Sequence, residues 1–365
     1  MPLGVLFLSD SHLGLDLPGR PRVARERRGD EIFESFERAL EPLSTGEAQV
    51  LVHGGDLFYR SRVPAWLADR VYARLAEIAD SGVDVFWVPG NHERSGVPRG
   101  LLLSHPRVRV FERPATFVVE REGVALALSG FPHAGTIRRD FPALLEATGW
   151  RDAAADARLL CIHQAVEGAT VGPSGYVFRS GDDVLAGRDV PPGFAAVLAG
   201  HIHRAQVLRR DLSGRPLASP VLFAGSIDRV SFAERFEPKG AFVLRVGANG
   251  AAGGAATWEF REHEVRPMAV VEIHPALPGL EERLRLALAA VAPRSLVRVR
   301  LTGEPGQEAA NLFRAAALRS LAPPGTTVSV SWRADASPRS AGSGVGSPPG
   351  SAARRRARDA GRASR

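Results

Sequence analysis

The sequence has one cysteine, one lysine and no long apolar run. A single cysteine cannot form an internal disulfide, so Cys161 excludes a disulfide framework and is typical of a reducing compartment. No run of about 18 apolar residues is present that could span a membrane. The first residues also lack the basic and apolar regions of a signal peptide. We therefore expect a cytoplasmic protein without a membrane partner.

The positive net charge is concentrated at the C-terminal end. Of the 47 basic residues, all but Lys239 are arginines. Residues 333–365 hold eight arginines against two aspartates, so the rest of the chain is close to neutral although the net charge is +7. Because this Ser-, Pro-, Gly- and Arg-rich composition cannot bury a core, we expect residues 334–365 to form a disordered tail. Net charge alone does not indicate a nucleic-acid partner.

Strand and helix patterns alternate along the first part of the chain. Apolar strands are predicted at 3–9, 49–53 and 84–88, and helices at 30–40 and 64–80. This order implies βαβ units and a largely parallel sheet. Further strands predict a second sheet beside the first, at 115–119, 124–129, 158–163, 195–199, 205–210, 221–224 and 241–246.

The pattern changes again near residue 266, after a Gly/Ala-rich segment at 247–256 that we expect to be a hairpin loop. Strands are then predicted at 268–274, 296–301 and 326–332, and helices at 279–291 and 307–321. We therefore expect an α/β protein with one large domain over residues 1–265 and a small α/β domain over residues 266–333.

Polar side chains follow five of the predicted strands at the points where they end. They are Asp10 and His12, Asp56, Asn91 and His92, His163, and His201 and His203. Each has an ordinary alternative, because a single histidine can be a hydrogen-bonded core residue and a single aspartate can form a turn. Since a parallel α/β sheet brings the carboxyl ends of its strands to one edge, we favour a common site.

The residue types at these strand ends are those of a metal site. Imidazoles, carboxylates and an amide form a mixed N/O donor set that suits Mn, Fe or Zn and lacks the thiolates of a structural zinc site. The donors are too many for one tetrahedral ion, but they suit two ions that share a bridging carboxylate, as in phosphoester hydrolysis. We therefore expect two divalent metal ions.

Taken in chain order, these motifs resemble the signature of the calcineurin-like metallophosphoesterases. More narrowly, the segments 9–14, 55–58, 163–164 and 225–229, together with Lys239-Gly240, resemble the SbcD nucleases, relatives of the eukaryotic double-strand-break repair nuclease. The similarity covers residues 1–265 and implies a four-layer α/β/β/α metallophosphoesterase sandwich. Residues 266–333 stand where that family carries a small α/β cap that contacts DNA.

The resemblance also implies roles for individual residues. The first metal ion would be held by Asp10, His12, Asp56 and His203, and the second by Asp56, Asn91, His163 and His201. Asp56 would bridge the two ions, which the family prefers to be manganese, and a water activated by both would attack phosphorus. His92 would not be a ligand but would protonate the leaving oxygen or stabilise charge on the phosphate. Apart from the resemblance, we expect Glu93 to orient His92 through its second ring nitrogen, as carboxylate partners of imidazoles do.

The sequence departs from the family pattern at two places. Tyr59 stands where many relatives carry Asp or His, and it can donate a hydrogen bond to a phosphate but cannot act as a base near pH 7. Where the family continues into helices that dock on an SbcC-type ATPase, this chain carries the Arg-rich tail. Use of that ATPase partner therefore stays an open expectation, as does the homodimer that the resemblance implies.

Several arginines are candidates for contact with DNA phosphates. They are Arg20, Arg22, Arg25, Arg27 and Arg28 in the loop after the first metal motif, and Arg229 in a turn after a later strand. The alternatives are a solvated basic loop and a structural turn. The arginines of the tail could add sequence-independent affinity or form an inert end.

Together these observations predict a metal-dependent DNA exonuclease or endonuclease that hydrolyses phosphodiester bonds in DNA repair or recombination. One alternative has the same fold and acts on a small ester such as a cyclic nucleotide, because a metal cage does not choose its substrate. Another is a DNA-binding scaffold subunit with weak chemistry. Whether the purified protein retains metal ions, and whether it turns over a substrate, would distinguish these three hypotheses.

Overall fold

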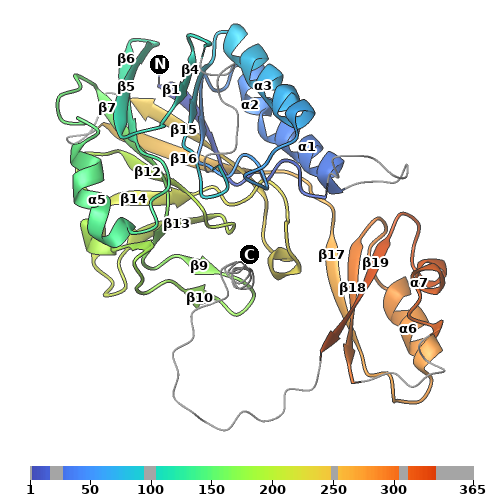
Figure 1. The fold of residues 1–365 in the computed structure, drawn as a ribbon. Coiled ribbons are helices and arrows are strands. Elements are labelled where there is room, and N and C mark those ends of the chain that lie inside the picture. Colours follow the sequence, from blue (N-terminus) through green and yellow to red (C-terminus); the bar gives the residue numbers. More distant parts are fainter. Residues whose placement is uncertain (1, 17–27, 94–103, 248–253, 304–310, 334–365) are drawn as a thin grey trace, which may run out of the picture.

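The computed structural model describes residues 2–16, 28–93, 104–247, 254–303 and 311–333 of the chain (Figure 1). These residues form two six-stranded sheets, a separate three-stranded sheet and the helices that cover them. The predicted tail at 334–365 lies outside the described residues.

The first sheet has the strand order β16-β15-β1-β2-β3-β4. At its centre β1 (Leu3–Leu8), β2 (Val50–His53) and β3 (Asp84–Trp87) run parallel, and β4 (Val108–Val110) continues the parallel set. The antiparallel hairpin of β15 (Gly240–Gly247) and β16 (Ala255–Glu262) completes the sheet beside β1. The loop predicted at 247–256 is corrected at both ends, because strand structure includes Gly247 and resumes at Ala255; residues 248–253 lie outside the described residues.

Helices cover the outer face of this sheet. They are α1 (Arg28–Ala39), the short α2 (Glu41–Ser44) and α3 (Ala65–Asp80). The spacing of Ile32 and Phe36 places both on the buried side of α1, where they join the cluster that contains Leu6 and Trp87 of the sheet. The parallel pairing of β1, β2 and β3 brings their carboxyl ends to the same edge of the sheet that these helices cover.

The second sheet has the order β13-β14-β12-β7-β6-β5. Its strands are β5 (Ala115–Arg121), β6 (Val124–Gly130), β7 (Ala157–His163), β12 (Ala196–Gly200), β13 (Gln206–Arg210) and β14 (Pro216–Phe223). Helix α5 (Ile137–Glu146), which sequence patterns did not predict, covers its outer face through Ile137 and Phe141. Short strands and a short 3₁₀ helix follow β7. They are β8 (Ala165–Val166), β9 (Thr170–Val171), β10 (Tyr176–Val177), β11 (Val184–Leu185) and the helix η1 (Gly187–Asp189).

The two sheets pack face to face around a shared apolar core. Val5 and Phe7 of the first sheet lie in one buried cluster with Leu126, Leu128 and Leu198 of the second. With α1 and α3 on one side and α5 on the other, the layers follow the order α/β/β/α (Figure 1). The predicted four-layer fold is confirmed.

A small three-stranded unit follows the sandwich, as the sequence predicts. Its parallel strands are β17 (Met268–Ile273), β18 (Leu296–Thr302) and β19 (Thr327–Arg333), with α6 (Leu280–Ala289) and α7 (Ala315–Leu321) between them. The predicted helix at 307–321 is corrected at its start: residues 304–310 lie outside the described residues, and helix begins at Ala315 because Arg314 is extended. The division into domains stays a prediction.

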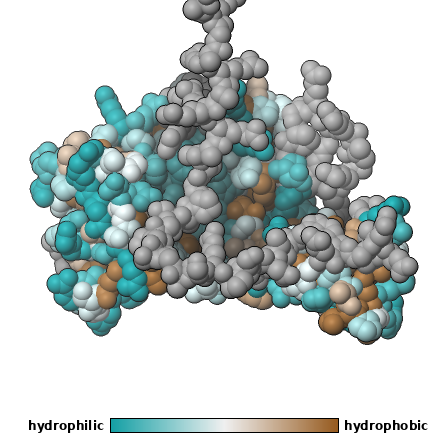
Figure 2. All heavy atoms as spheres, turned by 60° about the horizontal axis from the view of Figure 1, so that its bottom comes forward, coloured by the Kyte–Doolittle hydropathy of each residue, from teal (hydrophilic) through white to brown (hydrophobic). Residues whose placement is uncertain are grey.

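This C-terminal unit has its own core and carries some exposed apolar side chains. Leu284, Val299 and Leu301 belong to a buried cluster separate from those of the sandwich. Figure 2 shows apolar atoms on the part of the surface where this unit lies, and the exposed residues there include Leu277 and Leu286.

Within the described parts of the chain, no helix has both the length and the apolar composition needed to cross a bilayer.

Candidate metal centre

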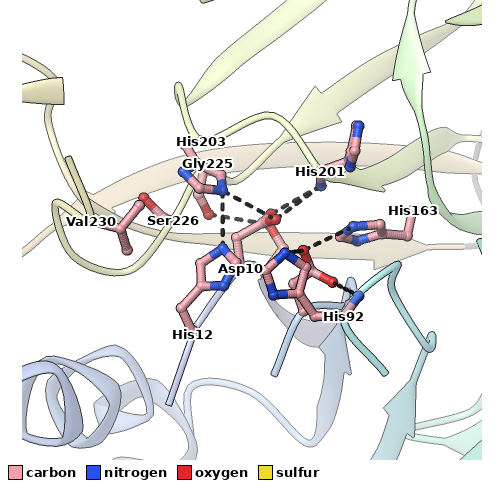
Figure 3. A network of polar contacts seen from close by, with 12 residues as sticks. Asp10, His12, His92, His163, His201, His203, Gly225, Ser226 and Val230 are labelled. Carbon is pink, nitrogen blue, oxygen red and sulfur yellow. Dashed lines mark hydrogen bonds and ion pairs between the residues drawn. The ribbon is translucent and has the colours of Figure 1, made fainter. Parts of the chain in front are cut away.

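The polar residues predicted at the five strand ends come together at one edge of the sandwich (Figure 3). The loop after β1 runs beside the loop after β2, because the Asp10 amide donates to the carbonyl of Gly55 at 2.9 Å and the His12 amide to that of Asp56 at 3.0 Å. The loop after β12 joins them, since the His201 amide donates to the carboxylate of Asp10 at 3.0 Å. Strands from both sheets therefore contribute to one site.

Backbone strain is concentrated at these residues. Asp10, His12, Asp56 and His201 have φ angles of 52°, 47°, 51° and 84°, a region that residues with a Cβ rarely adopt. They are four of the seven non-glycine residues with positive φ in the described chain. Such strain persists where surrounding structure enforces it, and it is typical of functional sites.

Two glycines allow the strand ends to approach each other. A Cβ at Gly90 would lie 2.2 Å from Oδ1 of Asp56, and a Cβ at Gly55 would lie 2.2 Å from Nδ1 of His163. Gly55 also has a φ of 104°. A side chain at either position would push the polar residues apart.

One group of potential ligands consists of Asp10, His12 and His203, whose donor atoms lie within 4.8 Å of one another. Nε2 of His12 is 3.0 Å from Nε2 of His203, and Oδ1 of Asp10 is 3.8 Å from the same His203 nitrogen. Burial holds the pKa of His12 well below its ordinary value, so this imidazole is neutral and can act as a ligand. Burial also raises the pKa of Asp10.

A second group consists of Asp56, Asn91, His163 and His201. Oδ1 of Asn91 lies 3.1 Å from Nε2 of His163 and 3.0 Å from Nδ1 of His201, and Oδ2 of Asp56 is 3.5 Å from the same His163 nitrogen. His163 uses its other ring nitrogen to donate to the carbonyl of Gly54 at 2.7 Å, which turns Nε2 into the site.

The charges of this second group are strongly coupled. Burial alone would lower the pKa of His163, but the adjacent Asp56 carboxylate raises it to about 9. Burial lowers the pKa of His201 to about 3, and the charge of His163 acts in the same direction. Without a metal ion, a proton on His163 therefore balances the carboxylate of Asp56.

His92 lies beside Asp56, and its ring orientation is fixed by the main chain. Nδ1 is 2.5 Å from the carbonyl oxygen of Tyr59, which can only accept, so this nitrogen carries a hydrogen. Nε2 is 3.8 Å from Oδ2 of Asp56 and belongs with His12 and Asp56 to a third group that could hold an ion. The expectation that Glu93 orients His92 is corrected, because Tyr59 does so.

Glu93 instead holds two of the metal-site loops together. Its buried carboxylate accepts hydrogen bonds from the amides of Asp56 at 2.9 Å, Phe58 at 2.9 Å and Gly90 at 2.7 Å. Burial, followed by the nearby charge of Asp56, raises the pKa of Glu93 to about 8. Two acceptor oxygens are needed for this arrangement, since Oε1 and Oε2 face different amides.

Replacement of Glu93 by glutamine should therefore destabilise the protein. The new amide nitrogen would face a main-chain N–H that has lost its acceptor, and an unsatisfied buried donor costs about 1–3 kcal/mol. Urea unfolding of the metal-free protein would measure the change. Glu77→Gln, in which an exposed carboxylate is altered, is the matched control, and an equal stability for both variants would contradict this role.

The remaining predicted substrate residues differ in their placement. The Tyr59 ring lies at the site, with its centroid 6.0 Å from that of His12 and 6.1 Å from that of His92. Arg28 forms an ion pair with buried Asp228, and Arg229 donates to the carbonyls of Arg266 and Glu237, so neither contact supports phosphate binding. The other predicted loop arginines, Arg20, Arg22, Arg25 and Arg27, lie outside the described residues.

Four polar residues at the site were missed by sequence reasoning. His53 at the end of β2 contacts Ser11 at 2.8 Å and could have been found by the same strand-end rule. The ring of His133 lies 5.6 Å from that of His201. Glu234 and Lys239 contact His203 across 31 and 36 residues, and no local pattern indicates such contacts.

The donor set fits divalent metal ions. In the described chain, imidazole nitrogens and carboxylate oxygens gather in three overlapping donor groups: Asp10, His12 and His203; His12, Asp56 and His92; and Asp10, Asp56 and His163. Nδ1 of buried His12 has no hydrogen-bond partner among the described residues. The sandwich and this site define a metal-dependent phosphoester hydrolase.

The chain belongs to the calcineurin-like phosphoesterase family, whose model matches residues 3–205. A DNA double-strand break repair protein Mre11, from Methanopyrus kandleri, is 26% identical over 73% of this chain and 58% of its own length. The chain thus matches less than two thirds of that relative.

Two other similarities have narrower coverage or lower identity. A probable cyclic nucleotide phosphodiesterase from a Pseudoalteromonas species is 33% identical over 25% of this chain and 31% of its own length. The crystal structure of a dimetal phosphatase from Danio rerio covers 71% of this chain and 99% of its own, with a TM-score of 0.39 and 13% identity.

Proposed function

We propose that this protein is a two-metal DNA nuclease of the SbcD type that hydrolyses phosphodiester bonds in DNA repair or recombination. The observation that carries the proposal is the convergence of two donor groups on Asp56, with His92 directly beside this carboxylate. A carboxylate with two oxygens can serve both members of a pair of ions about 3.5–4 Å apart.

The proposed ligands divide into two sets. Asp10, His12, Asp56 and His203 would hold one ion, and Asp56, Asn91, His163 and His201 would hold the other. When bound, the two ions, manganese in our proposal, would supply Lewis-acid stabilisation of the phosphate and an activated water. The protein contributes neutral imidazoles at His12 and His201, whose pKa values are lowered by burial.

His92 would act on the phosphate or the leaving oxygen through Nε2. Its Nδ1 is held by the carbonyl of Tyr59, so the ring cannot turn its other nitrogen away from the site without losing that contact. In the protonated state Nε2 carries a hydrogen toward the reacting group. Tyr59, at the same rim, would donate a hydrogen bond to a phosphate oxygen.

The arguments for DNA as the substrate do not come from the metal ligands. The relative from Methanopyrus kandleri, matched over 73% of this chain, is a DNA double-strand break repair protein, and in our proposal the C-terminal unit serves as a DNA-contacting cap. Predicted partners are an SbcC-type ATPase and a second copy of the chain, and the predicted compartment is the cytoplasm. A small-ester phosphodiesterase is the second candidate, favoured by the 33% identity to a probable cyclic nucleotide phosphodiesterase.

The test is Mn²⁺-dependent cleavage of end-labelled linear duplex and hairpin DNA, with bis-p-nitrophenyl phosphate as a small ester alongside. Cleavage of DNA that is abolished by EDTA and restored by Mn²⁺ is the expected result. Turnover of the small ester alone would favour the second candidate. DNA binding without turnover of either substrate would favour a scaffold subunit.

A further inference from the structure

The only lysine of the chain is buried beside the candidate metal centre. Lys239 directly precedes β15 and is 1% exposed. Its ammonium donates to Oε2 of Glu234 at 2.8 Å, to Oγ of Ser226 at 2.7 Å and to the main-chain oxygen of His203 at 2.9 Å. An ammonium group has three N–H donors, so all of them are used within the protein.

Glu234 connects this lysine to a predicted metal ligand. It lies in the short helix η2 (Phe232–Glu234), and its Oε1 is 3.2 Å from Nδ1 of His203. Because an ionised carboxylate only accepts, Nδ1 of His203 carries the hydrogen. In the neutral ring that metal binding requires, the lone pair is therefore on Nε2, which lies 3.0 Å from Nε2 of His12 and 3.8 Å from Oδ1 of Asp10 (Figure 3).

We propose that Glu234 and Lys239 are positioning residues that fix the tautomer and orientation of His203 for metal binding. The inference rests on the proposed metal centre. Lys239 holds His203 at two points, since it bonds the main-chain oxygen directly and reaches the ring through Glu234. Carboxylate partners of this kind orient ligand imidazoles and increase their basicity.

The geometry also explains why a chain rich in arginine has a lysine at this position. Three acceptors from separate segments converge on one compact ammonium group. A guanidinium is larger and holds its N–H donors in one plane. It could therefore not donate to three acceptors that surround a single point. Burial of a charge is costly unless it is paired and hydrogen-bonded, and this network meets both conditions.

A neighbouring glutamate provides a matched control. The Glu237 and Glu234 side chains have nearly equal exposure, 7% and 8%, and both lie near Nζ of Lys239, at 3.5 and 2.8 Å. Glu237 forms an ion pair with Arg204 at 3.1 Å, whereas Glu234 contacts the ring of His203. A general effect of removing a buried charge should therefore appear in both variants, and a positioning effect in only one.

The experiment is a calorimetric titration of the metal-free full-length chain with Mn²⁺, made for wild type, Glu234→Gln, Lys239→Met and Glu237→Gln. Circular dichroism would first establish that each variant is folded. We expect two Mn²⁺ sites in the wild type. Glu234→Gln and Lys239→Met should weaken one of them by about 10–100-fold and leave the other unchanged, the range typical for loss of a partner of a metal ligand. Glu237→Gln should leave both sites unchanged.

Wild-type affinity at both sites in folded Glu234→Gln would overturn the proposal, as would equal weakening of both sites. If Lys239→Met fails to fold, Glu234→Gln decides alone. Because the titration needs no DNA, its outcome is separate from that of the cleavage assay. A protein with Glu234-dependent metal binding but no DNA cleavage would refute the nuclease and support the positioning role.

Discussion

Replacement of His92 by alanine should reduce the rate of DNA cleavage by about 10²–10⁴-fold, the usual contribution of a general acid or base, while both metal sites stay intact. The imidazole lies beside the carboxylate on which the donor groups converge, with Nε2 3.8 Å from Oδ2 of Asp56. The contact that holds Asp56 in place comes from the main-chain amide of His92, which donates to Oδ1 at 2.9 Å. Alanine keeps that amide and loses only the ring.

Two measurements would check this expectation: single-turnover cleavage of labelled DNA and a Mn²⁺ titration of the same protein. His105→Ala is the matched control, because His105 contacts Asp80 at the surface, on helix α3, away from the metal-site loops. Loss of one Mn²⁺ ion in His92→Ala would instead make His92 a ligand, which its grouping with His12 and Asp56 also permits. An unchanged cleavage rate would exclude both roles.

The convergence of the metal-site residues could be predicted from the sequence because it follows from a general property of parallel sheets. Asp10 and Asp56 stand just beyond strands with readable apolar runs, and His163 is the last residue of another. Parallel strands end at the same edge of a sheet. The strands themselves are buried on both faces, which makes their composition distinctive. The same rule would have included His53.

Contacts between distant segments could not be predicted in this way. Arg28 is preceded by other arginines and followed by an acidic helix start, and nothing nearby shows that Asp228, 200 residues later, neutralises it. Glu234 and Lys239 have no periodic pattern that would indicate a contact with His203. The late start of α7 has a local cause, since the extended backbone of Arg314 interrupts a composition that otherwise favours helix.

Replacement of Asp56 by asparagine should remove metal binding at both sites together with DNA cleavage. Asp56 is a member of two of the three donor groups, one with His12 and His92 and one with Asp10 and His163. Asparagine keeps the shape and can still accept the amide of His92, but it lacks the charge and second oxygen that two cations would share. Loss of several kcal/mol of electrostatic stabilisation corresponds to about 10³-fold or more in rate.

The effect of Asp56→Asn should be measurable in the metal-free protein, before any substrate is added. In the metal-free protein the carboxylate of Asp56 opposes the effect of burial and raises the pKa of His163 to about 9, so Asp56→Asn should lower it. NMR titration of the His163 ring and a Mn²⁺ titration would measure the two effects. Asp84→Asn alters an aspartate on the same sheet that pairs with Arg107 and Arg121 and should change neither quantity. Retention of one full-affinity Mn²⁺ site in Asp56→Asn would show that the carboxylate serves a single ion, because a bridging ligand cannot be lost from one site alone.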